Sequence, residues 1–371
     1  MSTNTFITPT DVIMDANLFL ADQLVVGNLV NRTTETRFAS KVGDTVKVKV
    51  PPSLAASKFT GATVAANLSQ SSVDVVLQEH FYVRVDLTSD ELTQKLDDFN
   101  VNVTLPSVRG LIASVEEYFI AKIVGGFARN LVGTSGNEPS THAHILAGEK
   151  QIFVSKGDTS QLIGLITPTA HTSFAQLNIF TSADYGADRP GGLQSNSLGK
   201  LANITYFRSP YAGTFDQGDI AGTVLVMGAS QTGTSLVTNG YTAATGTVKE
   251  GTRLTIAGIT GTYIVSEDCT IAGNACTLKF TSALASSPAD DAALTFGTTP
   301  KENVIYNPSS VAGAILPGAI VGPNVAALNI MGVGCRIISN VSVETLAGSW
   351  VFDLYCGAKV VRNEYGAVFC G

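Results

Sequence analysis

Several short stretches of the sequence resemble sites for nucleotide or nucleophile chemistry, and none has the required spacing. The segment "GGLQSNSLGK" ends in Gly199 and Lys200, but Leu201 stands where a Walker motif needs Ser or Thr to hold magnesium. "GVGCRI" at 332–337 begins like a dinucleotide fingerprint and lacks its third glycine, and "GASQTG" at 228–233 is not a nucleophile elbow. We therefore predict a protein that is not an enzyme and uses no cofactor.

Two pairs of residues have side chains that bind metals or form disulfides. His142 and His144 would point the same way from a strand, but no Cys, Asp or third His stands at a familiar metal spacing, so a polar loop is the preferred interpretation. Cys269 and Cys276 flank "TIAGNA" and would face each other across a hairpin. A disulfide and two reduced core thiols both fit this spacing, and reduced thiols are favoured.

Two groups of charged residues are candidates for acid–base or interface sites. Glu116 and Glu117 are adjacent on a predicted helix, where neighbouring side chains diverge by about 100°, so a solvated or interface face is preferred to a carboxylate pair. Asp184, Asp188 and Arg189 lie in the predicted loop "TSADYGADRPGGLQSNS". They could bond across a symmetry axis or belong to a simple polar loop, and the sequence does not separate the two.

Composition narrows the class of protein. The chain has 371 residues, of which 14% are charged and 44% hydrophobic, and it contains 36 glycines, so strands and turns should dominate over long solvated helices. A surface with so few charges also suggests extensive coverage by partners. A formal net charge of −7 without a basic run disfavours a nucleic-acid reader.

Neither the start of the sequence nor its longest uncharged stretch predicts a membrane protein. The start, "MSTNTFITPTDV", lacks the basic and apolar regions of a signal peptide, which predicts reduced cytosolic cysteines. Residues 311–335 are uncharged and long enough to cross a bilayer, but prolines, asparagines and glycines interrupt them. We expect a buried loop, a short helix and a strand there.

The first third of the sequence predicts an arm, a hairpin and two helices. Residues 10–31 have the spacing of a helix, and "GDTVKVKVPPS" reads as a short strand ended by prolines. A second strand of the hairpin has the strongest period-2 pattern of the chain, with apolar residues at the odd positions Val73, Val75, Leu77, Phe81, Val83, Val85 and Leu87. So long a hairpin, with so little sequence to cover it, is expected to reach a neighbouring molecule.

Helix signals follow this hairpin. "TSDE" at 88–91 has the pattern of a capping box, which predicts a helix to about residue 99. A long helix is predicted from Pro106 onward by apolar residues at intervals of three and four: Val108, Ile112, Val115, Phe119, Ile123 and Phe127. It should be the longest rigid element of the chain.

The rest of the sequence predicts segments that mix helices and strands and one segment that contains strands alone. "LIGLITPTAHTSFAQL" predicts a strand and then a helix, and "LANITYFRSPY" predicts a further strand. Residues 223–300 are short Thr-, Val- and Gly-rich strands, which indicate an inserted barrel or sandwich. The closing stretch 348–371 has two alternating apolar segments, expected as a final strand pair that completes a sheet begun much earlier and locks the fold.

In this order the elements resemble the major capsid proteins of tailed bacteriophages, the Hong Kong 97 fold. The resemblance is carried by "DLTSDELTQKL", the long helix, "SLGKLANITYFRSPY" and the closing "RIISNVSVETLAGSWVFDLYCGAKVVRNEYGAVF". "VKEGTRLTIAGITGTYIV" resembles the inserted barrel of short-tailed (podovirus) phage coat proteins. The resemblance covers essentially the whole chain and implies an α+β fold with N-arm, E-loop, peripheral domain with spine helix, axial domain and inserted all-β domain.

The implied domains follow the chain in order. They are the N-terminal arm at 1–34, the E-loop hairpin at 35–88, the peripheral domain with the spine helix at 89–160, the axial domain at 161–222 and 301–345, the inserted β-barrel at 223–300 and the returning peripheral strands at 346–371. Phe81 and Arg84 in the hairpin, and Asp184, Asp188 and Arg189 in the loop at 182–197 near the five-fold and six-fold axes, become interface hypotheses.

The resemblance implies a virion protein that assembles in the host bacterial cytoplasm into an icosahedral procapsid, which expands as DNA is packaged. Its implied partners are itself in pentamers and hexamers, a separate scaffolding protein, a portal protein, decoration proteins, and double-stranded DNA held without sequence-specific contact. A separate scaffold is implied because only about ten residues precede the first predicted helix. Lys58 has no recognisable cross-link partner, so a non-covalent shell is expected. An encapsulin-type compartment and a secreted β-rich adhesin are the alternatives.

Overall fold

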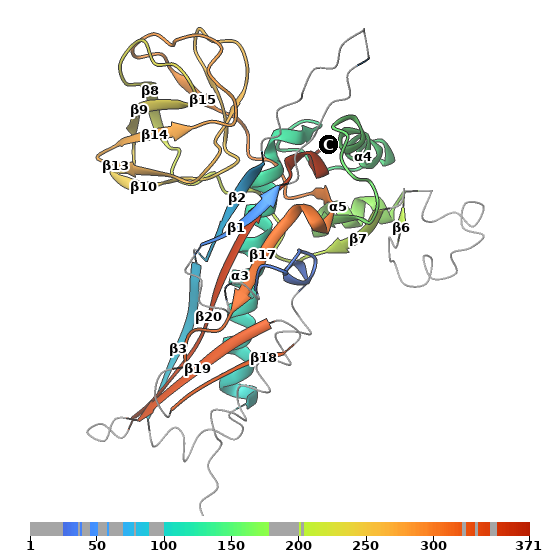
Figure 1. The fold of residues 1–371 in the computed structure, drawn as a ribbon, viewed down its shortest axis with the longest axis vertical. Coiled ribbons are helices and arrows are strands. Elements are labelled where there is room, and N and C mark those ends of the chain that lie inside the picture. The colour runs from blue at the N-terminus through green and yellow to red at the C-terminus, as the bar shows by residue number, and fades with distance from the viewer. Residues whose placement is uncertain are drawn as a thin grey trace, which may run out of the picture. The chain divides into compact units, whose positions relative to one another are not determined.

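The structure is a computed structural model, in which the chain forms two compact units. It describes residues 25–35, 38, 45–50, 58, 70–77, 79–88, 100–177, 200–201, 204–320, 324–330, 333–341 and 347–371. The first unit comprises Met1–Glu116 and Val311–Arg362, and the second comprises Glu117–Ser310 and Asn363–Gly371. The boundary falls inside α3 (Leu105–Phe127), the long helix of Figure 1.

The first unit is built around a five-stranded antiparallel sheet. Its long strand β20 runs beside β3, β17 and β19, and β18 follows β19 (Figure 1). The bounds of these strands are β3 Glu79–Thr88, β17 Val311–Leu316, β18 Val325–Ile330, β19 Val333–Val341 and β20 Ala347–Val360. The residues of β20 that pair with β3 include residues that also pair with β17 or with β19. A strand has two edges, so β3 occupies one edge of β20, and β17 and β19 share the opposite edge.

The predicted hairpin is present in part, and its second strand pairs differently from expectation. β1 (Thr45–Val50) pairs with β2 (Ser71–Val76) as a hairpin. The apolar alternation then continues in β3, whose odd positions are half-buried and whose even positions are exposed. Ten residues of β3 pair with β20 of the same chain, so the second half of this predicted strand belongs to a sheet of its own subunit. The contact of the hairpin with a neighbouring molecule stays a prediction.

Helix α3 confirms the strongest helical prediction. The six apolar positions predicted to form its buried face are all at most 2% exposed. A π-helical turn, Asn100–Thr104, precedes the helix, and a 3-10 turn, Ala128–Asn130, follows it. The predicted helix that begins after Thr88 lies outside the described residues.

The segment at residues 25–35 lies along β17 in the first unit. Val26–Asn28 is a 3-10 turn, so the α-helix predicted for 10–31 is absent from the described end of that range, and residues 10–24 lie outside the description. Asn31 donates its backbone N–H to Val311 O at 2.9 Å. Glu116 is 1% exposed and accepts the Val26 N–H at 2.7 Å. The prediction of a solvated or interface face was therefore wrong for Glu116 and fits exposed Glu117.

The second unit contains a six-stranded mixed sheet in the order β4-β21-β16-β5-β7-β6. Helices α4 (His142–Val154) and α5 (Pro168–Ala175) pack against it, and Thr167 caps α5 by accepting the Ala170 N–H. The predicted strand–helix pair and the following strand are confirmed. The strands are β4 Leu131–Val132, β5 Leu162–Ile166, β6 Lys200–Leu201, β7 Ile204–Arg208, β16 Val304–Tyr306 and β21 Gly366–Phe369, with 3-10 turns at Pro308–Ser310 and Asn363–Tyr365.

The two closing strands are deeply embedded, but they do not form a pair within one sheet. β20 is an inner strand of the first unit, and β21 lies between β4 and β16 in the second. Ala367, Val368 and Phe369 are completely buried. The end of the chain is thus part of the core, as predicted, whereas the expectation that both strands complete a single sheet was wrong.

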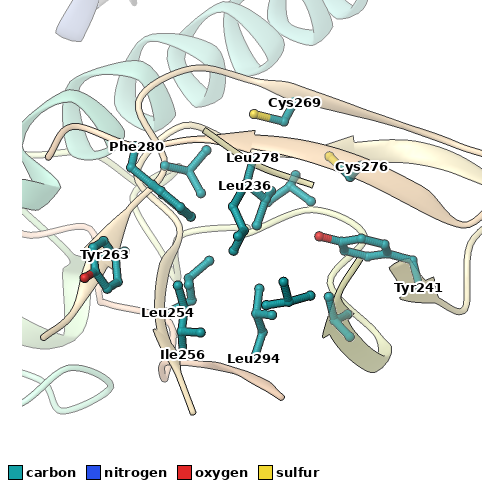
Figure 2. Close-up of a cluster of buried hydrophobic side chains, with 14 of the residues drawn as sticks. Leu236, Tyr241, Leu254, Ile256, Tyr263, Cys269, Cys276, Leu278, Phe280 and Leu294 are labelled. Atoms are coloured by element: carbon teal, nitrogen blue, oxygen red, sulfur yellow. The ribbon is translucent and has the colours of Figure 1, made fainter. Parts of the chain in front are cut away.

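Residues 223–300 form the predicted all-β insertion within the second unit. One sheet has the order β10-β13-β14-β9-β8 and another has the order β12-β11-β15. Figure 2 shows the apolar side chains that fill the space between the strands, among them Leu236, Leu254 and Leu278. The bounds are β8 Gly222–Val226, β9 Ser235–Tyr241, β10 Thr245–Val248, β11 Arg253–Ile256, β12 Tyr263–Ile264, β13 Cys269–Ala272, β14 Ala275–Lys279 and β15 Leu294–Phe296.

The uncharged stretch 311–335 is mostly strand. Its described residues belong to β17, β18 and β19 or to the connections between them, and the short helix expected there is not among them. Within the described part of the chain, no helix is long and apolar enough to cross a membrane.

The two ambiguous residue pairs now have definite positions. His142 and His144 lie in the first turn of α4 rather than on a strand, and His144 Nδ1 accepts the Ser140 N–H at 3.2 Å. Cys269 and Cys276 are both buried, free thiols. Cys276 is opposite Ile271, so Cys269 lies diagonally across the hairpin, not face to face with it.

Candidate functional site: a charged cluster on the first sheet

A group of charged side chains in the described part of the first unit lies where β3, β20 and β19 run side by side. Asp353 on β20 is opposite Tyr82 of β3 and Arg336 of β19, and Tyr355 is opposite His80. Residues that are directly opposite in a sheet share a face, so these five side chains project from the same side. The other side carries the completely buried residues Ile337, Phe352 and Leu354.

Asp353 is the centre of this cluster. Its side chain is 2% exposed, and its Oδ2 lies 2.7 Å from His80 Nε2. Arg336 donates Nε to Oδ1 at 2.8 Å and Nη2 to Oδ2, which makes a two-pronged contact. The His80 ring stacks on Tyr355, with ring centroids 4.1 Å apart and planes 6° from parallel. We call Asp353, Arg336 and His80 the strand cluster.

Arg336 extends the strand cluster beyond the sheet. Its Nη1 donates to Ala319 O at 2.6 Å, which ties the chain just after β17 to β19. The hydrogen bond to Asp353 is the main cause that raises the pKa of Arg336 above its ordinary value. The guanidinium therefore stays charged at any pH at which the protein is folded.

This geometry favours a mechanical role over a catalytic one. Both carboxylate oxygens of Asp353 already accept bonds from Arg336, and His80 faces one of them. Among the described residues, no group of three or more His, Cys, Asp or Glu side chains could hold a metal ion. The strand cluster joins β3 to β19 and β20, two strands that are close to each other in sequence and far from β3.

The two described residues among the predicted interface sites, Phe81 and Arg84, lie on opposite faces of β3. Phe81 is half-buried on the inner face of β3, opposite Leu354. Arg84 is on the outer face and pairs with Asp86 at 2.9 Å, with side chains that are 58% and 53% exposed. Asp184, Asp188 and Arg189 lie outside the described residues.

Sequence reasoning missed the strand cluster, although one signal of it was visible. Asp353 is the single charged residue in the otherwise uncharged stretch "GSWVFDLYCGA". A carboxylate in the middle of a buried strand requires a cationic or hydrogen-bonding partner. That rule predicts that a partner exists, but no local pattern identifies Arg336 or His80 as that partner.

A second group of contacts attaches the inserted domain to α3 within the second unit. Lys122 Nζ on α3 lies 2.5 Å from Asp268 Oδ2, and Asp268 Oδ1 accepts the Glu250 N–H at 2.8 Å. One helical turn further on, a Cβ atom added at Gly125 would lie 2.6 Å from Glu250 O. A Cβ atom added at Gly251 would lie 2.5 Å from Gly125 Cα. The helix and the turn before β11 therefore touch backbone to backbone.

Comparison with known proteins identifies the fold. No protein-family model and no curated protein matches the sequence. A solved structure from Mycobacterium phage Che8 matches with a TM-score of 0.55 and 13% identity, over 99% of this chain and 93% of that chain. The capsid structure of Cyanophage P-SCSP1u matches with a TM-score of 0.50 and 11% identity, over 100% of this chain and 91% of that chain.

These matches confirm the fold predicted from the order of elements. The chain has an α+β fold of the Hong Kong 97 type. At such low identity the likeness establishes the fold and not the activity, because one fold can carry many functions.

Proposed function

We propose that this chain is the major capsid protein of a tailed double-stranded DNA phage. The observation that carries the proposal is the similarity in fold to a phage capsid over 100% of this chain, which includes the insertion and both closing strands, and over 91% of that chain. A partial match would leave open a shared core with unrelated additions. A match along the full length supports a shell subunit.

The proposed subunit assembles with itself, through pentamers and hexamers, into an icosahedral procapsid around a separate scaffolding protein. The shell expands as DNA enters through a portal protein, and decoration proteins bind outside. The net charge of −7 supports a wall that contains DNA without binding its sequence. Assembly takes place in the cytoplasm of the host bacterium, and the product is a virion.

The domain boundaries deduced from the resemblance are part of the proposal. Phe81 and Arg84 in the hairpin and Asp184, Asp188 and Arg189 in the axial loop remain proposed interface positions. Arg84 has the exposure that such a role requires, and Phe81 would contribute by orienting β3 from the inner face.

Expression with and without the candidate scaffolding protein tests the proposal, with negative-stain microscopy and sedimentation as the measurements. We expect uniform closed shells with the scaffold, and aberrant shells or free subunits without it. Uniform shells without any scaffold would indicate an encapsulin-type compartment. A well-behaved monomer in both conditions would contradict the proposal and favour the adhesin.

A non-covalent shell is the second part of the proposal. Lys58 is exposed and so could take part in a cross-link. Mature particles boiled in SDS should nevertheless run as a single band at the mass of the monomer. A ladder of covalent oligomers would overturn this part while leaving the capsid proposal intact.

A further inference from the structure

A pocket lies within the second unit, between the inserted domain and the segment at residues 131–135. Its volume is about 310 Å³, room for a carboxylate side chain and several waters at about 30 Å³ each. The inserted domain contributes the outer surface of the sheet β12-β11-β15, where Thr255 is directly opposite Thr295. Leu131 and Phe296 add apolar walls.

The Arg253 side chain lines this pocket and has few hydrogen-bonding partners among the described residues. The side chain is half-buried, and its one hydrogen bond within the described ranges is a long contact of 3.4 Å from Nη1 to Ala128 O. No carboxylate in those ranges forms an ion pair with it. Burial lowers the pKa of the Arg253 guanidinium, which is the effect of a poorly compensated charge.

The rim of the pocket is held in place by a reciprocal pair of hydrogen bonds. Ser135 Oγ donates to Thr298 O at 2.6 Å, and Thr298 Oγ1 donates to Ser135 O at 3.0 Å. Gly297, between β15 and this rim, donates its N–H to Arg253 O at 2.8 Å. The guanidinium therefore lies beside a rim that hydrogen bonds hold in place. Little conformational entropy is lost when binding orders this rim.

We propose that this pocket, built around Arg253, receives an Asp or Glu side chain from a second copy of this chain. A guanidinium offers a planar carboxylate two parallel donors, and the threonine hydroxyls can complete its hydrogen bonding. The pocket is too small for a folded element and has room for one acidic side chain together with several waters. The partner is a second copy because this chain carries 30 acidic residues against 23 basic ones and, by the proposed function on which this inference rests, packs against itself in a shell.

The first test is charge reversal at Arg253 in the full-length protein. Arg253→Glu should lower the yield of closed shells about tenfold or more, because truncating a buried interfacial charge pair has a large effect on association. Lys279→Glu is the matched control: it makes the same change of charge in the same domain, at an exposed residue paired with Glu267. The control should assemble as the wild type does.

A second variant covers the case in which Arg253→Glu does not fold. Thr255 is two residues along β11 on the same side as Arg253, about 7 Å away, so Thr255→Asp supplies a carboxylate from within the subunit. We expect the free subunit of this variant to unfold at the same temperature as the wild type or higher, and its shell yield to fall about tenfold.

The outcomes separate the two proposals. Wild-type levels of assembly in both Arg253→Glu and Thr255→Asp would overturn the pocket proposal and leave the capsid proposal standing. If the wild type itself forms no shell with any scaffold, the capsid proposal fails and this inference fails with it. Loss of assembly in Lys279→Glu to the same extent as in Arg253→Glu would also overturn the pocket proposal, because it would make the effect one of net charge alone.

Discussion

At the scale of single residues, Asp353 connects its own strand β20 to β3 through His80 and to β19 through Arg336. Replacement by Asn removes the charge while keeping the shape, and it leaves the Arg336 guanidinium, whose side chain is 14% exposed, without its anion. Breaking a buried pair by neutralising one partner destabilises a protein by about 3–5 kcal/mol. We expect Asp353→Asn to lower the free energy of unfolding by about 3 kcal/mol in urea titration.

The control for Asp353 is on the neighbouring strand. Asp86→Asn removes an exposed partner of Arg84 on the same side of the sheet, and it should leave the urea midpoint unchanged within error. Equal destabilisation by both substitutions would show that the strand cluster has no special role.

Glu302 is expected to make stability depend on pH. It is 7% exposed and accepts the Gly213 N–H at 2.6 Å, and burial raises its pKa above the ordinary 4.5. A carboxyl group whose pKa is higher in the folded state binds more protons there than in the unfolded chain. It therefore favours the folded state below about pH 4.5, and this contribution is lost as the pH rises through the folded pKa.

Replacement of Glu302 by Gln tests this linkage. The free energy of unfolding, measured in urea at each pH, should fall for the wild type relative to Glu302→Gln as the pH is raised from 4 to 7. The variant should therefore gain stability relative to the wild type over this range. Glu364→Gln, at an exposed carboxylate of the same unit, should give a flat difference. A flat difference for both variants would rule out a raised pKa at Glu302.

At the scale of elements, two glycines of α3 differ in what surrounds them. A Cβ atom at Gly110 would meet Val83 at an ordinary 3.7 Å, whereas one at Gly125 would meet Glu250 O at 2.6 Å. Alanine is better than glycine in a helix by about 1 kcal/mol. Gly110→Ala should therefore raise the free energy of unfolding, and Gly125→Ala should lower it by forcing the turn before β11 away from the helix.

Hydrogen exchange distinguishes separation of the inserted domain from general unfolding. In Gly125→Ala the amides around Glu250 and Lys122 should exchange faster, while those in the interior of the inserted domain keep their protection. A stabilised Gly125→Ala with unchanged exchange would show that the contact between α3 and this turn is adaptable.

At the scale of the whole molecule, the inserted domain has the features of an independent folding unit. It has its own core, and its two connections to the rest of the second unit lie side by side: Phe215 donates its N–H to Pro300 O, and Glu302 donates its N–H to Gly213 O. Adjacent ends are what allows one domain to be inserted in a loop of another. We expect a fragment of residues 214–301 to fold alone and to unfold cooperatively in calorimetry.

A core substitution provides the check on that fragment. Leu278 is completely buried among the side chains of Figure 2, and Leu278→Ala should cost about 2–5 kcal/mol. It should unfold the fragment or markedly lower its transition temperature. If the fragment unfolds without cooperativity before any substitution, the inserted domain depends on its contacts with α3.

The sequence by itself determined most of the individual elements, because periodicity is a local property. Apolar residues at intervals of three and four predicted the buried face of α3, and period-2 alternation predicted which side of β3 is half-buried. The change to short Thr- and Gly-rich strands predicted the inserted domain. The order of these elements was enough to predict the fold.

Only the tertiary structure decided which strands are neighbours and which charges meet. β3 pairs with β20, although more than half of the chain separates them, and the two closing strands belong to different sheets. The alternation of β3 would be satisfied by any partner strand with an apolar side, in the same chain or in another. Asp353 likewise demands a cation without specifying one, because the energy of a buried charge depends on what the fold brings to it across the sheet.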